Sequence, residues 1–367
     1  MANNTQNQYI PDYVSPPGET LLETLETLGM TQADLADRTG RPRKTINKII
    51  RGKTSITPET ALQLERVLGT PARFWSNRER HYRESLARAE ERDKLHSQLD
   101  WLKRIPVKAM VAKKWLPAFE DTVDQLVAVV EFFGVTSPQQ WERIWMGASV
   151  SFRQSPAFES DPGAVSAWLR KGELEALEID CQPYNADGFR EALLAIRGLT
   201  ATSPEEFMPQ MRALCAQAGV AVVFVPELPQ TRTSGVTRWL SPQKALIQLS
   251  LRYKTDDHLW FTFFHEAGHI LLHGKRDVFL EDGNGQTEKE SQADRFAADF
   301  LIPPAEWEQF GPTGQHYSEV NVVNFADRIG IAPGIVVGRL QRERLVPFSH
   351  LNGLKRHLIW ADTEGAI

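Results

Sequence analysis

The chain has 367 residues, more than one compact core usually holds, so we expect two or three domains. Its 41% of hydrophobic and 24% of charged residues are ordinary for a soluble globular protein. The net charge of −5 excludes a polycation, so any contact with nucleic acid must come from a local basic patch.

Cysteine content and the N-terminal segment bear on the compartment. Cys181 and Cys215 are too few for a disulfide framework or a thiolate zinc site, and they suit a reducing environment. Residues 1–18 lack the basic-then-apolar pattern of a signal peptide, and no apolar run approaches the roughly 20 residues of a membrane helix. We therefore expect a cytoplasmic protein without membrane contact.

Short helices come first in chain order. Leucines at helical spacing begin after Gly18, Thr31 is a good N-cap, and Gly40 is a good helix end. The expected helices cover residues 19–28, 31–40, 42–51 and 57–68, and a fifth begins near residue 71.

The pattern becomes mixed further along the chain. Residues 79–104 alternate in charge and predict a solvated helix, and helices separated by Ser-Pro and Asp-Pro signals continue to residue 215. The expected strands are 220–225, 235–239 and 244–250. Helices are then expected at 259–273 and 289–301, with a loop at 275–288 between them and a mainly helical tail at 318–358.

A basic segment stands out in this net-acidic chain. Residues 31–53 contain seven Lys or Arg against two Asp, a local charge of +5. Two short helices around a Gly-containing turn are typical of a helix-turn-helix, whose second helix reads bases in the major groove. The expected DNA-binding residues are Gln32, Arg43, Lys44, Thr45, Asn47 and Lys48. On charge alone, a solvated basic face on a protein-interaction bundle is an equal alternative.

The order of residues in this segment resembles the lambda-repressor type of regulator, often called XRE. The run TQADLADRTGRPRKTINKIIRGK carries the resemblance, and the continuation from Ile56 to Trp75 is similar to the HigA-like antitoxin branch. The resemblance covers residues 17–83. It implies double-stranded operator DNA as a partner and a homodimer as the binding form.

A second motif, His265-Glu266-Ala267-Gly268-His269, lies in an apolar helical stretch. Histidines four residues apart project from one helix face and can bind one metal ion, here expected to be Zn²⁺. Glu266 would lie beside that ion, where it can take a proton from water and pass it to a leaving amine. A buried His/Glu hydrogen-bond network without metal is the alternative.

Zinc in hydrolases usually takes a third protein ligand. Glu290 on the following helix is the expected one, with Glu288 and His273 as alternatives. Asp294 lies one turn beyond Glu290 and could orient a ligand histidine, or it could be an ordinary exposed charge.

The two histidine and acidic motifs resemble the ImmA/IrrE-type metallopeptidases. FTFFHEAGHILLH and the run from Glu290 to Pro303 carry the resemblance, which covers residues 200–310. It implies zinc bound by His265, His269 and Glu290, with Glu266 as the general base. The family more often has Asn where this chain has Asp294. Some relatives cleave a helix-turn-helix repressor and so relieve repression.

The strands before the histidine motif have a possible use. Peptidases of this class hold an extended substrate along a strand edge, which residues 235–240 or 245–250 could present. Arg252 and Tyr253 follow directly; a structural role is the favoured prediction for both, and contact with substrate is the alternative.

One internal repeat is visible. Residues 325–330 (FADRIG) resemble residues 35–40 (LADRTG), but Ile335, Val336 and Val337 stand where the first copy has Thr45, Ile46 and Asn47. The second copy is therefore predicted to pack inside the protein rather than to read DNA.

Together these patterns predict a mainly α chain with a small β-sheet (α+β), in four parts. They are a lambda-repressor-like DNA-binding domain at 1–83, a helical connector at 84–200, a zincin-like metallopeptidase core at 201–310, and helices packed on that core at 311–367.

The expected function is a sequence-specific transcription regulator with a zinc-dependent endopeptidase that cleaves a repressor or itself. One alternative is an antitoxin-like repressor whose metal domain senses or binds a partner toxin without proteolysis. Another is a zinc protease whose N-terminal bundle docks proteins.

Overall fold

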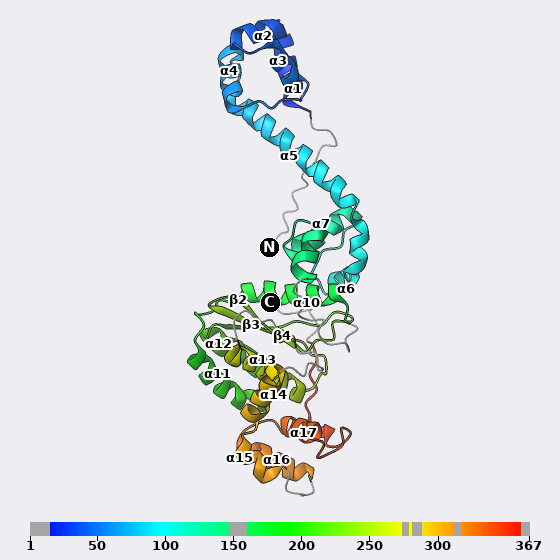
Figure 1. The fold of residues 1–367 in the computed structure, drawn as a ribbon, viewed down its shortest axis with the longest axis vertical. Coiled ribbons are helices and arrows are strands. Elements are labelled where there is room, and N and C mark those ends of the chain that lie inside the picture. The colour runs from blue at the N-terminus through cyan, green and yellow to red at the C-terminus, as the bar shows by residue number, and fades with distance from the viewer. Residues whose placement is uncertain (1–14, 147–159, 274–278, 281–287, 312–316, 361–367) are drawn as a thin grey trace. The chain divides into compact units, whose positions relative to one another are not determined.

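The computed structural model describes residues 15–146, 160–273, 279–280, 288–311 and 317–360. The chain divides into two compact units, residues 1–98 and 99–367, which are described separately (Figure 1). Residue 83, the expected end of the first domain, falls inside a helix that continues to His96. The four-part division stays a prediction.

The first unit is a bundle of helices. They are α1 (Pro17–Thr27), α2 (Gln32–Thr39), α3 (Arg43–Ile50), α4 (Pro58–Leu68) and α5 (Ala72–His96). Apolar side chains at helical spacing meet in one core, in which the residues exposed by 1% or less are Leu21, Leu25, Leu35, Ile46, Ala61, Leu64 and Trp75.

Local signals define the helix-turn-helix of this unit. Thr31 caps α2: the Asp34 N–H donates to Thr31 Oγ1 at 3.1 Å, and the Thr31 N–H donates to Asp34 Oδ2 at 2.9 Å. Gly40 ends α2 in the left-handed region, at φ 69°. Both predicted ends of α2 are therefore confirmed, and the turn brings α3 across α2.

The second unit is mostly helical. Its helices are η1 (Leu99–Arg104), α6 (Val107–Ala112), α7 (Thr122–Phe133), α8 (Pro138–Trp141), η2 (Glu142–Met146), α10 (Pro162–Leu177), α11 (Ala186–Gly198), η3 (Leu199–Ala201), α12 (Pro204–Gln217), α13 (Asp256–Leu272), α14 (Glu288–Leu301), α15 (Pro304–Phe310), α16 (Glu319–Ile329), α17 (Pro333–Arg342) and η4 (Asn352–Leu354). The α+β prediction is confirmed.

Within the described residues, the sheet has four strands in the order β1-β3-β2-β4. They are β1 (Val220–Phe224), β2 (Gly235–Ser241), β3 (Lys244–Leu249) and β4 (Phe279–Leu280). β1 is parallel to β3, whereas β2 is antiparallel to both β3 and β4. Helix α10 covers one face of the sheet, and α12 and α13 pack on the other (Figure 1).

Two expectations for this region were wrong. Residues 245–250 cannot present a free edge, because β3 lies between β1 and β2 and pairs with both. The expected loop at 275–288 contains β4, which pairs with Val236 and Thr237 of β2; the rest of that loop lies outside the described residues, except Glu288, which begins α14. A two-residue strand has too few positions to show the alternation that predicts strands.

Helices α16 and α17 form the second copy of the repeat. They are bent by 114° from each other, within the roughly 90–120° of a helix-turn-helix. The residues of α17 that are 5% exposed or less include Ile335, Val336 and Val337, which join the core that also contains α13. The predicted packing role is confirmed.

Among the described residues, no single helix is long and apolar enough to cross a membrane. The bent pair α16 and α17 meets that criterion of length and composition only when its two helices are taken together.

Candidate metal centre and DNA-binding surface

Helix α13 carries the histidine motif in the centre of the second unit. His265, Glu266 and His269 are 2%, 0% and 1% exposed. Gly268 sets the spacing to the next helix, because a Cβ there would lie 3.0 Å from Phe296 and 3.3 Å from the Cα of Ala293. The missing side chain thus lets α14 approach closely.

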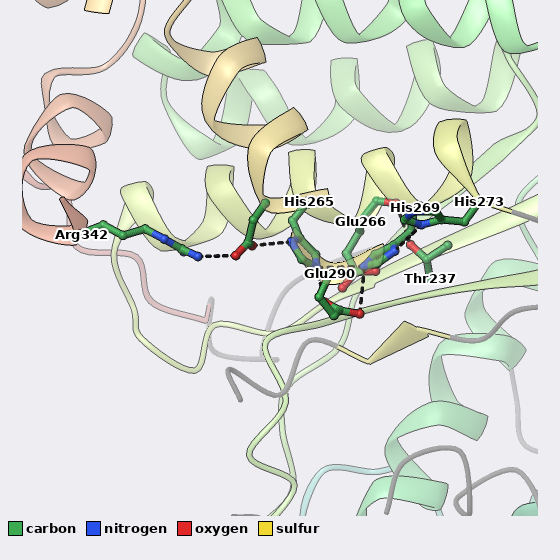
Figure 2. Close-up of polar contacts among 8 residues, drawn as sticks. Thr237, His265, Glu266, His269, His273, Glu290 and Arg342 are labelled. Atoms are coloured by element: carbon green, nitrogen blue, oxygen red, sulfur yellow. Dashed lines mark hydrogen bonds and ion pairs between the residues drawn. The ribbon is translucent and has the colours of Figure 1, made fainter. Parts of the chain in front are cut away.

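This close packing brings Glu290 of α14 to the two histidines (Figure 2). Its carboxylate oxygens lie 3.1 Å from His265 Nε2 and 3.4 Å from His269 Nε2, and the two Nε2 atoms are 2.9 Å apart. Four ligands at about 2.0–2.1 Å from zinc in a tetrahedron lie roughly 3.3 Å from one another. The observed distances suit three corners of such a site.

The outer nitrogen of His265 faces the second acidic residue named from the sequence. His265 Nδ1 lies 3.0 Å from Asp294 Oδ1, and Arg342 Nη2 donates to Asp294 Oδ2 at 2.5 Å. An ionised carboxylate can only accept, so His265 carries its proton on Nδ1 and turns the lone pair of Nε2 toward Glu290 and His269.

A chain of side chains that ends at Glu288 orients His269 in the same way. Gln292 Nε2 donates to Glu288 Oε1 at 3.2 Å, which turns the amide oxygen toward His273 Nε2, also at 3.2 Å. His273 then donates from Nε2 and accepts at Nδ1, so His269 donates from Nδ1 across 2.9 Å. Glu288 and His273, the alternative third ligands, therefore lie outside the cluster and support His269 instead.

The protonation states suit a metal centre. Burial, the largest single effect, acts to raise the pKa of Glu290, but the two imidazoles beside it together lower that pKa to about 2. Burial, the largest effect, holds the pKa of His269 below its usual value. Neutral imidazoles and an ionised carboxylate are the forms that bind a divalent cation.

The donor set also fits a cation for an electrostatic reason. Both imidazoles turn the lone pair of Nε2 inward, and the two Nε2 atoms are only 2.9 Å apart. Two lone pairs and a carboxylate at this distance repel unless a positive charge lies among them. Two nitrogens and one oxygen are a usual ligand set for zinc in hydrolases.

Strand β2 closes the other side of Glu266. A Cβ on Gly235 would lie 2.8 Å from Glu266 Oε1, so only glycine lets the strand pass here. Thr237 donates its hydroxyl to the backbone oxygen of Glu266 at 3.0 Å. The side chain predicted to move protons is thus held between α13 and β2, a strand that pairs with β3 on one side and, at Val236 and Thr237, with β4 on the other.

The two residues after β3 make local contacts. Arg252 donates to the backbone oxygen of Arg232 and lies over the ring of Tyr253. Tyr253 in turn stacks on His258, with ring centroids 4.3 Å apart. These contacts agree with the structural role that was favoured for both residues.

In the first unit, α3 separates a buried from an exposed face. Ile46 and Ile49 are buried, whereas Arg43, Lys44 and Lys48 are exposed. The expected DNA-binding residues Gln32, Thr45 and Asn47 are partly buried at the junction of α2 and α3, where Asn47 Nδ2 donates to Gln32 Oε1 at 3.4 Å. Basic side chains and short polar side chains therefore share one outer face.

One basic residue of the segment 31–53, Arg41, makes contacts within the helical bundle instead of lying on this outer face. Arg41 donates to Gln63 Oε1 at 2.5 Å and pairs with Glu59 at 3.4 Å, so it connects the α2–α3 turn to α4.

Sequence reasoning did not predict Arg342 as a site residue, because it lies 48 positions beyond its partner Asp294 and belongs to no motif.

Comparisons with known proteins match the N-terminal and C-terminal regions of the chain to different families. Residues 21–75 match the helix-turn-helix family model, and residues 215–341 match the model of the IrrE N-terminal-like domain of peptidase family M78. The uncharacterised HTH-type transcriptional regulator YddM of Escherichia coli (strain K12) is 31% identical over 75 residues, which are 20% of this chain and 78% of that protein.

Two solved structures are similar to the N-terminal part. One is an addiction module antidote protein of a HigA family from Coxiella burnetii, 33% identical, covering 23% of this chain and 92% of its own, with a TM-score of 0.22. The other is the Pseudomonas aeruginosa antitoxin HigA with the higBA promoter, 30% identical, covering 22% and 90%, with the same TM-score.

The chain therefore belongs to the helix-turn-helix transcription regulators through its N-terminal domain. It is a DNA-binding regulator of the XRE type fused to an ImmA/IrrE-like peptidase domain that contains a His/His/Glu group able to hold a metal ion.

Proposed function

We propose that this protein is a sequence-specific transcription regulator whose C-terminal domain is a zinc-dependent endopeptidase. The observation that carries the proposal is the convergence of His265, His269 and Glu290 within 4.8 Å, with Glu266 beside them. Its expected protein substrate is a repressor or the chain itself, it binds operator DNA as a homodimer, and it acts in the cytoplasm.

The three ligands and the general base divide the chemistry. His265, His269 and Glu290 would hold the ion, which would supply Lewis acidity to polarise a peptide carbonyl and to acidify water. Glu266 accepts a proton from the attacking water and donates it to the leaving amine. Its burial between α13 and β2 strengthens its interaction with the charges around it.

The DNA-binding half of the proposal rests on the outer face of α3. Arg43, Lys44 and Lys48 neutralise phosphates and set the docking register, and Asn47 with Gln32 offers amide groups to base edges. Proteolysis then changes transcription by removing a DNA-bound repressor, either a partner protein or this chain.

The decisive experiment compares the zinc-loaded wild type with the Glu266→Gln variant. Each is incubated with purified repressor proteins encoded beside its gene and alone, and fragments are identified by mass spectrometry. We expect specific fragments from the wild type and at least a 100-fold loss in the variant, as is typical when a general acid–base group is removed.

A matched control uses another glutamate of the same unit. Glu308 is exposed on α15, so Glu308→Gln should cleave as the wild type does. Equal cleavage by the Glu266→Gln variant would remove Glu266 from the mechanism. Zinc binding without any fragments would favour the antitoxin-like repressor whose metal domain binds a partner.

A further inference from the structure

We propose that Arg342, at the end of α17, is a positioning residue of the metal centre: it holds Asp294 so that Asp294 fixes His265. The proposal rests on the proposed metal-binding function and extends it to a C-terminal helix that supplies no ligand. Figure 2 shows the line of contacts from Arg342 through the carboxylate to His265.

The first contact is the ion pair. Arg342 Nη2 lies 2.5 Å from Asp294 Oδ2, while Asp294 Oδ1 lies 3.0 Å from His265 Nδ1. One carboxylate oxygen thus serves each partner. With Oδ2 held by the guanidinium, Oδ1 stays directed at the imidazole and keeps the proton on Nδ1.

A second contact involves the same arginine and the same histidine. The guanidinium of Arg342 lies over the ring of Phe261, 4.5 Å from its centroid, and that ring lies 6.3 Å from the ring of His265. Phe261 is one turn before His265 on α13. Arg342 therefore touches both groups that flank the imidazole on this side, and each contact restrains the position of the other.

The identity of residue 294 explains why an arginine is needed. Asp294 is only partly buried, and a carboxylate is free to rotate toward water, which would leave His265 without its acceptor. An asparagine at this position could offer its amide oxygen without a counter-charge. Asp294 and Arg342 therefore act as a pair: Arg342 holds the carboxylate of Asp294 in place, and Asp294 orients His265.

The test measures metal affinity by titrating the full chain with Co²⁺, read by visible absorption and by competition with a chelator. We expect Arg342→Ala to weaken Co²⁺ binding about tenfold, the lower end of the effect of residues that orient a ligand. Arg342→Lys, which keeps the positive charge, should bind Co²⁺ more tightly than the alanine variant does. Arg344→Ala removes an equal charge two residues on and should match the wild type.

A double-variant comparison separates this role from general stabilisation. In the Asp294→Asn background, Arg342→Ala should change Co²⁺ affinity no further, and the metal-free thermal midpoint should be alike with and without Arg342. An equal loss in both backgrounds, or unchanged affinity in Arg342→Ala, would overturn the proposal. A wild type that binds no Co²⁺ would overturn the proposed function first, before any substitution is made.

Discussion

The chain builds the same two-helix unit twice, and the two copies differ in what their second helix meets. In α2–α3, Lys44 and Lys48 are exposed on a basic face. In α16–α17 the corresponding positions are Gly334 and Gly338, where a Cβ would lie 2.5 Å from Asp256 Oδ1 and 2.8 Å from Asp257 Oδ2. The two positions that are free to contact a DNA phosphate on α3 are packed against the start of α13 on α17.

This difference teaches that the helix-turn-helix geometry alone does not determine function. A few residues on the second helix decide whether that helix is exposed or packs into a core. The end of the first helix is similar in the two copies: both have Ala-Asp-Arg shortly before the glycine, and Gly40 and Gly330 have φ values of 69° and 71°. Substituting apolar residues for polar ones on the outer face converts a surface that can read DNA into a surface that joins a core.

The largest effect should come from breaking the buried copy. Val337 is fully buried, so Val337→Asn places an amide among apolar side chains and should lower the free energy of unfolding by about 3 kcal/mol. Chemical denaturation of the full chain, followed by tryptophan fluorescence, measures it. Val320→Asn is the control because Val320 is 67% exposed on α16.

The reciprocal change sharpens this comparison. Asn47→Val on α3 should alter stability by only about 0.5 kcal/mol, since it removes one long hydrogen bond to Gln32 at a partly exposed position. It should nevertheless weaken operator binding. A large loss of stability in Asn47→Val, or none in Val337→Asn, would show that the two copies are not divided in this way.

The next effect concerns the acid that faces Gly334. Burial is the main cause that raises the pKa of Asp256 to about 6, and the charge of Asp257 raises it further. The backbone N–H and the charge of Arg356 act in the opposite direction. Lys355 forms an ion pair with Asp257. The folded pKa lies above the unfolded value of about 3.9. Asp256 therefore costs no stability below pH 4; the cost grows as the pH rises from about 4 to about 6 and stays constant above that.

Asp256→Asn should remove this cost while keeping an oxygen for the backbone N–H groups of Asp257 and Arg356. The variant should match the wild type near pH 4 and be more stable by about 2 kcal/mol at pH 7.5. Thermal unfolding across this range measures it. Asp327→Asn, an exposed acid of α16, should give a pH-independent difference; a parallel pair of curves for Asp256→Asn would contradict the assignment.

The smallest effect is on the exposed copy. Lys44→Ala combined with Lys48→Ala should leave stability unchanged, weaken binding to operator DNA roughly tenfold, and lower the slope of log K against log salt by about 2. Fluorescence anisotropy at several salt concentrations measures both quantities. Wild-type affinity in the double variant would place the DNA contacts on another surface of the first unit.

The sequence predicted the site where it depends on spacing within one helix. His265 and His269 share a face of α13 because they are four residues apart, and that follows from helical geometry alone. The choice between Glu290 and Glu288 depends on how α14 is rotated against α13, which sequence periodicity leaves open. The resemblance named Glu290, and the packing at Gly268 brings it to the histidines.

The contributions that the sequence did not predict come from distant segments. Arg342 and strand β4 both lie outside every motif: Arg342 reaches the site through its ion pair with Asp294, and β4 pairs with β2 at two backbone positions. Long-range contacts of this kind follow from the tertiary arrangement, and single-sequence patterns report only local geometry.

Gly268 bears on any attempt to rebuild this centre in another protein. Two histidines can be placed four residues apart on almost any exposed helix. A carboxylate like that of Glu290 reaches them only if the neighbouring helix packs closely against the backbone of the histidine helix. Glycine makes this possible, because it has a hydrogen where every other residue has a Cβ carbon. A design must therefore reproduce the short distance between the two helices as well as the three ligand residues.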